Sequence, residues 1–157
     1  MLKKISKKII TFIFIVFIYS ACEKNEGITT DTLPVQTGLF NSVVSHDGLS
    51  RQFIMYVPTN YNSDIEYPLM INFHGFGGTA SDFVETADMR SLAENENFII
   101  VYPQGTLLGG FPHWNSSAPS SDNKSSVDDI GFVEKMIENI SSTYSINEKR
   151  VYAAGYS

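Results

Sequence analysis

The stretch His74-Gly75-Phe76-Gly77-Gly78, HGFGG in one-letter code, separates a short apolar run from an amphipathic segment. The run before it, residues 69–73, has the length and composition of a strand that is buried in a parallel sheet. The segment after it offers Thr79 or Ser81 as a helix cap and carries an imperfect apolar face that extends to Ala93. The pentapeptide is therefore predicted to form a loop that joins a strand to a helix.

Further strands surround this loop. Residues 40–45 and 51–57 are rich in β-forming residues and flank the pair Asp47-Gly48, which favours a turn with positive φ, so they are predicted to form an antiparallel hairpin. Residues 98–102 and 151–154 are short and apolar, as strands buried in a parallel sheet are. The order of elements predicts an α/β fold in which an antiparallel hairpin is followed by parallel strands with crossover helices.

A second helix is predicted before the last strand. Ser126 is the expected N-cap, and Asp128 and Asp129 place negative charge in the first turn, where the helix dipole favours it. Apolar residues then recur at spacings of three and four, at Ile130, Val133, Ile137, Ile140 and Tyr144. This pattern predicts a helix that packs one face on the sheet.

Residues 105–126 are rich in Gly, Ser, Pro and Asn and are predicted to form a long loop with a functional role. Trp114 and Asn115 are candidates for lining a substrate pocket, and a role for Trp114 as the buried anchor of the loop is an equal alternative. His113 is expected in this loop, and His46 is expected to be solvated in a turn. No pair of histidines has the spacing of zinc ligands.

Two chemical interpretations of HGFGG are open. Gly75-x-Gly77-x-x-Ala80 matches the dinucleotide-binding fingerprint, but the next strand runs into Tyr102-Pro103-Gln104 without the acidic residue that would hold a ribose. Alternatively, the glycines let a main-chain N–H approach a carbonyl oxygen that becomes negatively charged during acyl transfer. In α/β-hydrolases such a loop follows the third strand, so Phe76 is the expected donor and His74 a supporting hydrogen-bonding residue.

The residues Gly155-Tyr156-Ser157 follow the strand that would be the fifth. A Gly-x-Ser signal is weak by itself, but the nucleophile elbow of α/β-hydrolases stands at this place in the chain order. Ser157 is therefore the candidate nucleophile, and the base and acid that activate such a serine are expected after it.

An ordered set of motifs extends from residue 38 to residue 157. Its members are RQFxxYVP at 51–58, YPL at 67–69 leading into His-Gly, FIIVYP at 98–103, WN at 114–115, DDxGF at 128–132, and RVY at 150–152 leading into Gly-x-Ser. In order and spacing the set resembles the secreted esterases that include polyhydroxybutyrate depolymerases, feruloyl esterases and acetylxylan esterases. The resemblance implies the N-terminal half of an α/β-hydrolase fold, truncated at the nucleophile Ser157, with Phe76 as the oxyanion donor in a loop formed with His74, Gly75, Gly77 and Gly78.

The resemblance implies a serine carboxylic ester hydrolase that acts on feruloyl or acetyl esters of plant polysaccharide, or on a polyhydroxyalkanoate-type polyester. It implies no metal and no organic cofactor. The catalytic Asp and His are expected beyond Ser157, so segment 22–157 alone is expected to be inactive and poorly stable, with an unpaired sheet edge. A non-catalytic surface lipoprotein with the same fold, or a nucleotide-binding Rossmann protein, are the alternative hypotheses.

The N-terminus has the pattern of an export signal, because lysines precede an apolar run at residues 9–18. Small residues then lead into Cys22, which is the chain's only cysteine, in an arrangement that resembles a bacterial lipobox. Residues 1–21 are predicted to be a signal peptide of lipoprotein type, 22–37 a flexible tether and 38–157 the partial esterase domain. The protein is expected to be exported and held in the cell envelope or outside the cell by a lipid on Cys22.

The distribution of charged residues along the chain limits the classes of partner that the protein can bind. Four of the eleven basic residues and none of the seventeen acidic residues lie in segment 1–21, so the remainder carries a net charge of −10. This charge argues against nucleic acid and against anionic lipid surfaces. The expected partners are an ester-bearing polysaccharide or polyester substrate, and a membrane only through the lipid anchor.

Overall fold

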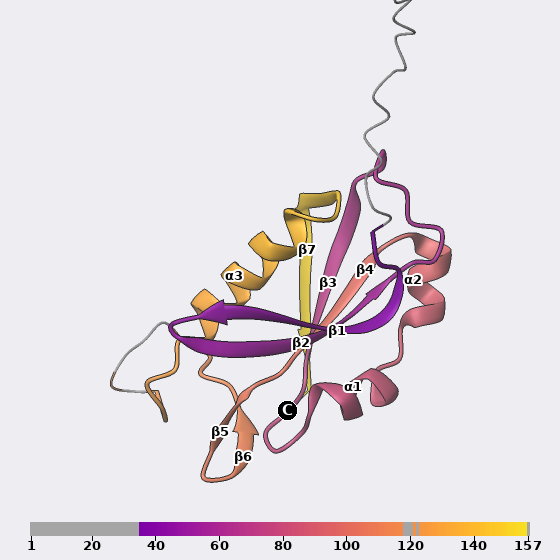
Figure 1. Ribbon diagram of the computed structural model, residues 1–157. Coiled ribbons are helices and arrows are strands. Elements are labelled where there is room, and N and C mark those ends of the chain that lie inside the picture. Colours follow the sequence, from indigo (N-terminus) through magenta and orange to yellow (C-terminus); the bar gives the residue numbers. More distant parts are fainter. Residues whose placement is uncertain (1–34, 118–120, 122, 157) are drawn as a thin grey trace, which may run out of the picture. The chain divides into compact units, whose positions relative to one another are not determined.

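The computed structural model describes residues 35–117, 121 and 123–156 (Figure 1). The expected signal peptide, Cys22 and Ser157 lie outside these residues. In chain order the elements are β1 (Gly38–His46), β2 (Leu49–Val57), β3 (Tyr67–Phe73), α1 (Ala80–Thr86), α2 (Arg90–Glu96), β4 (Ile99–Pro103), β5 (Thr106–Leu108), β6 (Phe111–His113), α3 (Asp129–Ser141) and β7 (Ile146–Gly155). No helix in the described part of the chain combines the length and apolar character needed to cross a membrane.

Five strands form one mixed sheet in the order β1-β2-β4-β3-β7. The predicted hairpin is present, with Asp47 and Gly48 at φ 48° and 73° in its turn, and β2 pairs antiparallel with β4. Strand β3 lies parallel to both β4 and β7, and HGFGG follows β3, which is the third strand in the chain. This arrangement confirms the predicted fold class.

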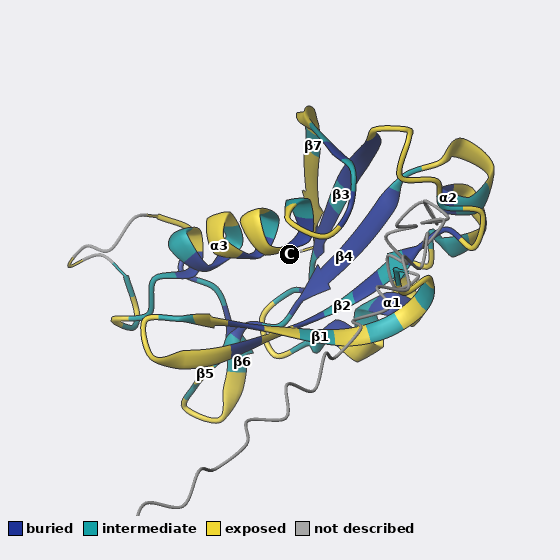
Figure 2. Cartoon of the chain, turned by 45° about the horizontal axis from the view of Figure 1, so that its top comes forward, coloured by how far each residue is buried: buried dark blue, intermediate teal, exposed yellow. Residues whose placement is uncertain are grey.

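Strand β7 forms one edge of the sheet and is longer than the predicted 151–154. Among the described residues its neighbour is β3, and the two strands shift register between Tyr67 and Leu69, on either side of Pro68. Because proline has no N–H to donate, an irregular register at this point is expected. Within the part of the chain that the structure describes, no strand pairs with the other side of β7, and residues 152–155 are exposed (Figure 2).

Helices cover both faces of the sheet. Ile99 and Val101 of β4 pack in a cluster with the buried face of α3, whereas Ile100 and Tyr102 pack in a second cluster with α1 and α2. Successive side chains of a strand point to opposite faces, so a strand covered on both sides must be apolar at every position. β4 meets this requirement, because all five of its residues are buried (Figure 2).

The single helix predicted from Thr79 to Ala93 is wrong, because the chain forms two short helices there. Thr79 does cap α1, since its hydroxyl accepts from the Asp82 N–H at 3.1 Å. The break follows from Asp88, whose carboxylate accepts from both the main-chain N–H and the guanidinium of Arg90 at 3.0 and 2.8 Å. A short acidic side chain that binds nearby backbone N–H groups favours a turn over a continued helix.

The start of α3 differs from the prediction, and its buried face differs in part, because Val133, Ile137 and Ile140 do pack in or against the core as predicted. Asp128, not Ser126, is the N-cap, because its carboxylate accepts from the Gly131 N–H at 3.0 Å. Ile130 is 41% exposed, and the fully buried apolar positions are Phe132, Met136 and Ile140. These three residues are spaced by four and form the stripe that faces the sheet.

The predicted long loop contains a small antiparallel hairpin, β5–β6. Its turn is made by Gly109 and Gly110, whose φ values of 58° and 90° are in the left-handed region that glycine tolerates. The hairpin extends from the sheet near the end of β3 (Figure 1). It places His113 on a strand rather than in a loop.

Candidate active site

A cavity of about 650 Å³ lies at the carboxyl ends of β3 and β7, where ligand sites of open α/β sheets are found. Five segments line it: the end of β3 with the following loop, the end of β6 with the residues after it, residues 123–124, the start of α3, and the end of β7 with Tyr156. The lining residues are Phe73, His74, Gly75, Phe76, His113, Trp114, Asn115, Ser116, Asn123, Lys124, Asp129, Ile130, Gly155 and Tyr156. The cavity therefore brings together the first three residues of HGFGG, Trp114 and Asn115, and the two residues before Ser157, whereas Gly77 and Gly78 are not part of its lining.

In the loop after β3, the main-chain N–H groups of the last two glycines are committed and, among the described residues, that of Phe76 is not. The Gly77 N–H donates to the Pro112 carbonyl at 2.8 Å, and the Gly78 N–H donates to the Gly75 carbonyl at 3.0 Å. Within the described residues the Phe76 N–H donates to no carbonyl. Gly77 has φ +77°, a conformation that favours glycine and turns the loop back toward β6. An uncommitted N–H beside a cavity is suited to bind a developing oxyanion.

His74 supports this loop with both ring nitrogens. Its Nδ1–H donates to the Gly75 carbonyl at 2.8 Å, and its Nε2 accepts from the Gly105 N–H at 3.0 Å. His74 as a whole is 3% exposed. A neutral imidazole with one nitrogen donating and the other accepting has no site left to take a proton from a nucleophile, so His74 acts as a structural residue of the loop.

Trp114 combines the two roles that the sequence left open. Its indole N–H donates to the His74 carbonyl at 3.0 Å, and its ring meets Phe73 edge to face with centroids 5.2 Å apart. The same residue lines the cavity. Trp114 therefore anchors the loop to the start of HGFGG and forms part of the cavity wall.

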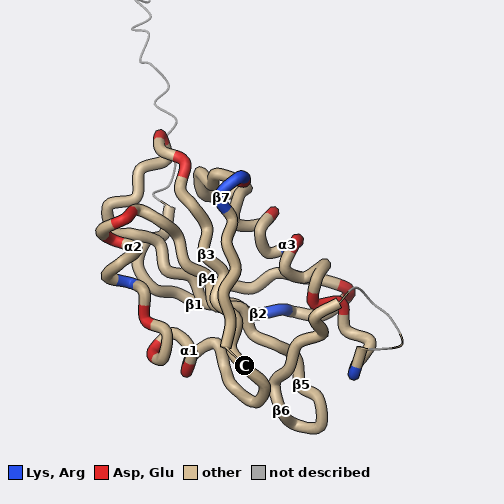
Figure 3. The backbone as a smooth tube through the Cα atoms, turned by 180° about the vertical axis from the view of Figure 1, so that it is seen from behind, with Lys and Arg blue, Asp and Glu red and all other residues tan. Residues whose placement is uncertain are grey.

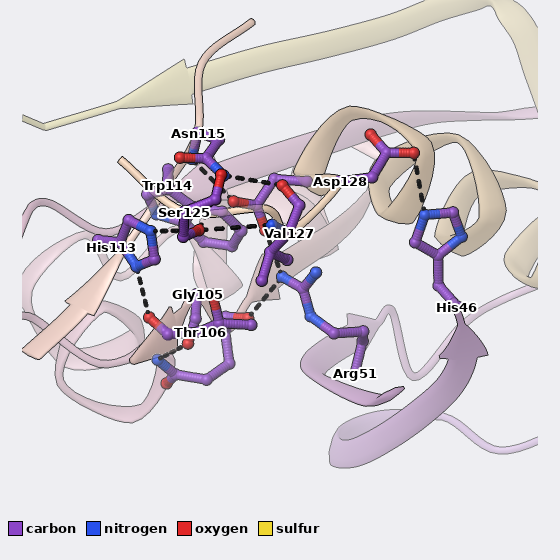
Figure 4. Close-up of polar contacts among 12 residues, drawn as sticks. His46, Arg51, Gly105, Thr106, His113, Trp114, Asn115, Ser125, Val127 and Asp128 are labelled. Carbon is purple, nitrogen blue, oxygen red and sulfur yellow. Dashed lines mark hydrogen bonds and ion pairs between the residues drawn. The ribbon is translucent and has the colours of Figure 1, made fainter. Parts of the chain in front are cut away.

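Asn115 is held by hydrogen bonds to the chain that precedes α3 (Figure 4). Its side-chain amide donates to the carbonyls of Ser125 and Val127 at 3.1 and 2.8 Å, and its main-chain N–H donates to Asp129 Oδ2 at 2.8 Å. The Ser125 hydroxyl also lies 3.1 Å from Nε2 of the buried His113. These bonds fix the cavity wall. The NH₂ group of Asn115 is used in them, because it donates to carbonyls of the protein itself.

A buried ion pair beneath the cavity was missed by the sequence analysis. Arg51 Nη2 lies 2.6 Å from Asp129 Oδ1, both side chains are at most 3% exposed, and the guanidinium lies 3.9 Å from the centre of the Phe132 ring. The signal was present: β2 points residues 51, 53, 55 and 57 inward, so an arginine at the first of these positions requires a buried anion. The two carboxylate oxygens of Asp129 accept hydrogen bonds from this arginine and from the Asn115 N–H.

His46 is not the solvated turn residue that was expected. Its Nε2 lies 3.2 Å from Asp128 Oδ2, and its side chain is 18% exposed (Figure 4). A Cβ at Gly131 would lie 2.2 Å from Asp128 Oδ2 and 2.8 Å from the His46 ring, so glycine permits this contact between hairpin and helix. The Gly131 N–H, with His46 as a further partner, holds the pKa of the Asp128 carboxyl below its ordinary value.

Among the described residues, His46, Asp47 and Asp128 are the group whose potential ligand atoms lie within 4.8 Å of one another. They lie on the hairpin turn and the α3 cap, and none of them lines the cavity. The two aspartates of the DDxGF motif therefore cap α3 and pair with basic side chains.

Two of the main-chain N–H groups at the start of α1 are already bound, which weighs against the dinucleotide interpretation. The Ala80 N–H donates to Gln104 Oε1 at 2.9 Å, and the Asp82 N–H donates to the Thr79 hydroxyl at 3.1 Å. A pyrophosphate would need such free N–H groups at a helix N-terminus. Gln104, which follows β4 where a ribose-binding acid would be expected, instead closes the start of this helix.

Comparisons with known proteins agree with the geometry. No protein-family model matches the chain. Feruloyl esterase B of Piromyces equi is 30% identical over 107 residues, which are 68% of this chain and 19% of that protein. A bifunctional acetylxylan esterase/xylanase of Neocallimastix patriciarum is 26% identical over 117 residues, which are 74% of this chain and 16% of that protein. The chain thus spans less than a fifth of the length of these two relatives.

Solved structures share the fold. The acetyl xylan esterase from Aspergillus awamori superposes with a TM-score of 0.59 at 20% identity, over 74% of this chain and 42% of that one. A fluorophosphonate-binding serine hydrolase of Staphylococcus aureus superposes with a TM-score of 0.57 at 12% identity, over 76% of this chain and 47% of that one. The chain therefore has part of the α/β-hydrolase fold of these esterases, and its sequence is similar to those of feruloyl and acetylxylan esterases.

Proposed function

We propose that the complete protein is a carboxylic ester hydrolase with Ser157 as its nucleophile. The observation that carries the proposal is the single cavity shared by the glycine-rich loop after β3 and by Gly155 and Tyr156 at the end of β7. Tyr156 also donates its N–H to the Phe73 carbonyl at 3.2 Å, which holds the end of β7 beside the start of that loop. The support for Ser157 is therefore its place in the sequence, directly after two residues that line the cavity beside Phe76.

The proposed reaction uses the usual parts of acyl transfer. The Ser157 hydroxyl attacks the ester carbonyl, a histidine further along the chain takes its proton, and an aspartate further along orients that histidine. The carbonyl oxygen becomes an oxyanion and accepts from the Phe76 N–H. The alcohol leaves with the proton, and water then releases the acid by the same steps. A single oxyanion donor contributes about 10²–10³ in kcat in well-studied hydrolases.

For the substrate, we propose feruloyl or acetyl esters of plant polysaccharide first and a polyhydroxyalkanoate-type polyester second. The support is the resemblance to feruloyl esterase B and to an acetylxylan esterase/xylanase. A cavity of about 650 Å³ also lies within the range that accommodates small organic groups. No cofactor is needed for this chemistry.

We propose further that the protein is exported and lipid-anchored through Cys22. The support is the sequence pattern of lysines, an apolar run and small residues before a single cysteine. Metabolic labelling with a palmitate analogue should tag the wild-type protein, and Cys22→Ala should lose the tag and appear in the culture medium. Equal labelling of the two proteins would contradict the anchor.

The test of activity compares the complete gene product with two serine variants. Wild-type protein should hydrolyse p-nitrophenyl acetate and methyl ferulate, and Ser157→Ala should abolish both activities. Ser91→Ala, which changes an exposed serine on α2 outside the cavity lining, is the control and should remain active. A folded wild-type protein without hydrolysis of either ester would favour the non-catalytic lipoprotein instead.

A further inference from the structure

Two exposed phenylalanines meet at the rim of the cavity. Phe76 is 63% exposed and Phe111 is 58% exposed, although large aromatic side chains usually gain stability from burial. Their ring centroids are 5.8 Å apart with an interplanar angle of 32°. Exposed apolar residues scattered singly need no explanation, but a contacting pair beside a cavity indicates a binding surface. We refer to Phe76 and Phe111 as the aromatic rim.

The fold holds the aromatic rim in place from both sides. The hairpin that carries Phe111 is attached to the loop that carries Phe76, because the Gly77 N–H donates to the Pro112 carbonyl at 2.8 Å. Gly77 has φ +77°, and a Cβ built on it would lie 3.9 Å from the Phe111 ring. The two rings are therefore fixed by backbone contacts between segments that are far apart in the sequence.

The register of the β5–β6 hairpin shows which way Phe111 is directed. Phe111 and His113 are two residues apart on β6, so their side chains share one face, and His113 is buried and lines the cavity. Leu107 is opposite Pro112 in the register, so it belongs to the other face, where it is 68% exposed. Phe111 thus lies on the cavity side of the hairpin, and Leu107 does not.

The two segments that carry the aromatic rim contain no charged residue, and the charged residues of the cavity lining, Lys124 and Asp129, come from other segments. Residues 67–81 and 97–121 contain no Asp, Glu, Lys or Arg in a chain that is 18% charged. In Figure 3 the β5–β6 hairpin and the loop after β3 are free of coloured segments, whereas charged residues gather on other parts of the chain. An uncharged aromatic surface favours a neutral, planar, apolar ligand over an ionic one.

We propose that the aromatic rim binds an aromatic ring on the acid part of the ester and so determines specificity for aryl esters. The inference rests on the proposed hydrolase function, in which the Phe76 N–H binds the carbonyl oxygen. A carbonyl held by this N–H lies next to the Phe76 side chain, so a ring joined to that carbonyl by a short spacer can reach the rim. Aromatic rings favour offset or edge-to-face contacts with centroids about 4.5–7 Å apart, and the exposed faces of Phe76 and Phe111 offer such contacts.

The test uses two esters that differ only in the group at the far end of the same double bond. Methyl cinnamate carries a phenyl ring there and methyl crotonate carries a methyl group. In the complete protein, Phe111→Ala should lower the ratio of kcat/KM for cinnamate to kcat/KM for crotonate by about tenfold, a discrimination typical of a lost apolar contact. Phe111→Leu should give an intermediate ratio, and Leu107→Ala, on the other face of the same hairpin, should leave the ratio unchanged.

The outcomes distinguish a failure of the aromatic rim from a failure of the proposed hydrolase function. Hydrolysis of both esters by all variants with an unchanged ratio would overturn the aromatic rim and leave the hydrolase intact. A lost preference for a ring in the alcohol, measured with benzyl acetate against ethyl acetate, would overturn the assignment to the acid part. Hydrolysis of neither ester by folded wild-type protein would overturn the proposed function and the inference with it. Thermal unfolding of each variant, together with the more conservative Phe111→Leu, separates a misfolded protein from a lost contact.

Discussion

The substitution Asp129→Asn should strongly destabilise the complete protein while leaving the shape of the side chain unchanged. The Asp129 carboxylate accepts from Arg51 Nη2 at 2.6 Å through one oxygen and from the Asn115 N–H at 2.8 Å through the other. An amide has only one oxygen, so one of these two donors would face an NH₂ group. The substitution also removes the negative charge that compensates a buried guanidinium.

The size of the effect follows from the remaining partners of Arg51. Within the described residues these are the Gln104 carbonyl at a long 3.5 Å and the face of the Phe132 ring, while Nη1 has no hydrogen-bond partner. Removing one member of a buried ion pair costs about 3–5 kcal/mol, because the other charge remains buried. With a urea m-value of about 2 kcal/mol per M, the midpoint of unfolding should fall by about 2 M.

The assay is urea unfolding of the complete protein followed by tryptophan fluorescence, because Trp114 stands in the affected region. Glu138→Gln is the matched control: it removes one carboxylate from an exposed pair with Lys135 and should leave the midpoint nearly unchanged. The double variant Arg51→Met/Asp129→Leu removes both charges and should recover much of the loss. A midpoint for Asp129→Asn equal to that of the control would refute the buried-pair account.

Three further predictions concern the cavity wall and the start of α3. Gly105→Ala should destabilise the protein by about 1–3 kcal/mol in thermal unfolding, because a Cβ there would lie 2.4 Å from the His113 carbonyl oxygen; an unchanged midpoint would contradict this close approach. Trp114→Phe should lower kcat severalfold with little change in KM, because it removes the donor to the His74 carbonyl and loosens the loop that carries the Phe76 N–H; equal kcat values would show that this bond does not position the loop. For Asp128→Asn the asparagine oxygen can still cap α3, so the variant isolates the charge. Because the Gly131 N–H and His46 lower the folded-state pKa of Asp128 below the ordinary 3.8, the carboxylate stabilises the fold above that pH and loses this effect as pH falls through the folded value. The difference in unfolding free energy between wild type and Asp128→Asn should thus be present at about pH 7 and shrink below about pH 4, and a difference that stayed constant with pH would contradict the sign.

Much of the sheet could be predicted from the sequence because its signals are local. The Asp47-Gly48 turn and the buried runs that became β3 and β4 have patterns that depend on a few adjacent residues. The place of HGFGG after the third strand followed from counting these strands. Gly109-Gly110 is an equally local hairpin signal. The hairpin was not predicted, because residues 105–126 were assigned to a loop from their composition alone.

The long-range contacts could not be predicted in the same way. Arg51 contacts Asp129 only because α3 packs on the face of the sheet to which this residue of β2 points. His46 contacts Asp128 only because Gly131 has no side chain that would fill the space between them. The local pattern also predicted a helix that continues through Asp88. Its carboxylate instead accepts a hydrogen bond from the Arg90 N–H, where the chain turns. The exposed pairing of Phe76 with Phe111 likewise depends on how the loop after β3 meets the β5–β6 hairpin.

The proposal that most needs a test is that Ser157, which follows the cavity-lining Gly155 and Tyr156 in the sequence, is the nucleophile. The most direct measurement is to treat the complete protein with a fluorophosphonate and to identify the modified residue by peptide mass spectrometry, with ester hydrolysis followed in the same sample. The account predicts one phosphonyl group on Ser157, activity lost in proportion to labelling, and no labelling of Ser157→Ala. Labelling of a different serine, or full hydrolysis by Ser157→Ala, would contradict it.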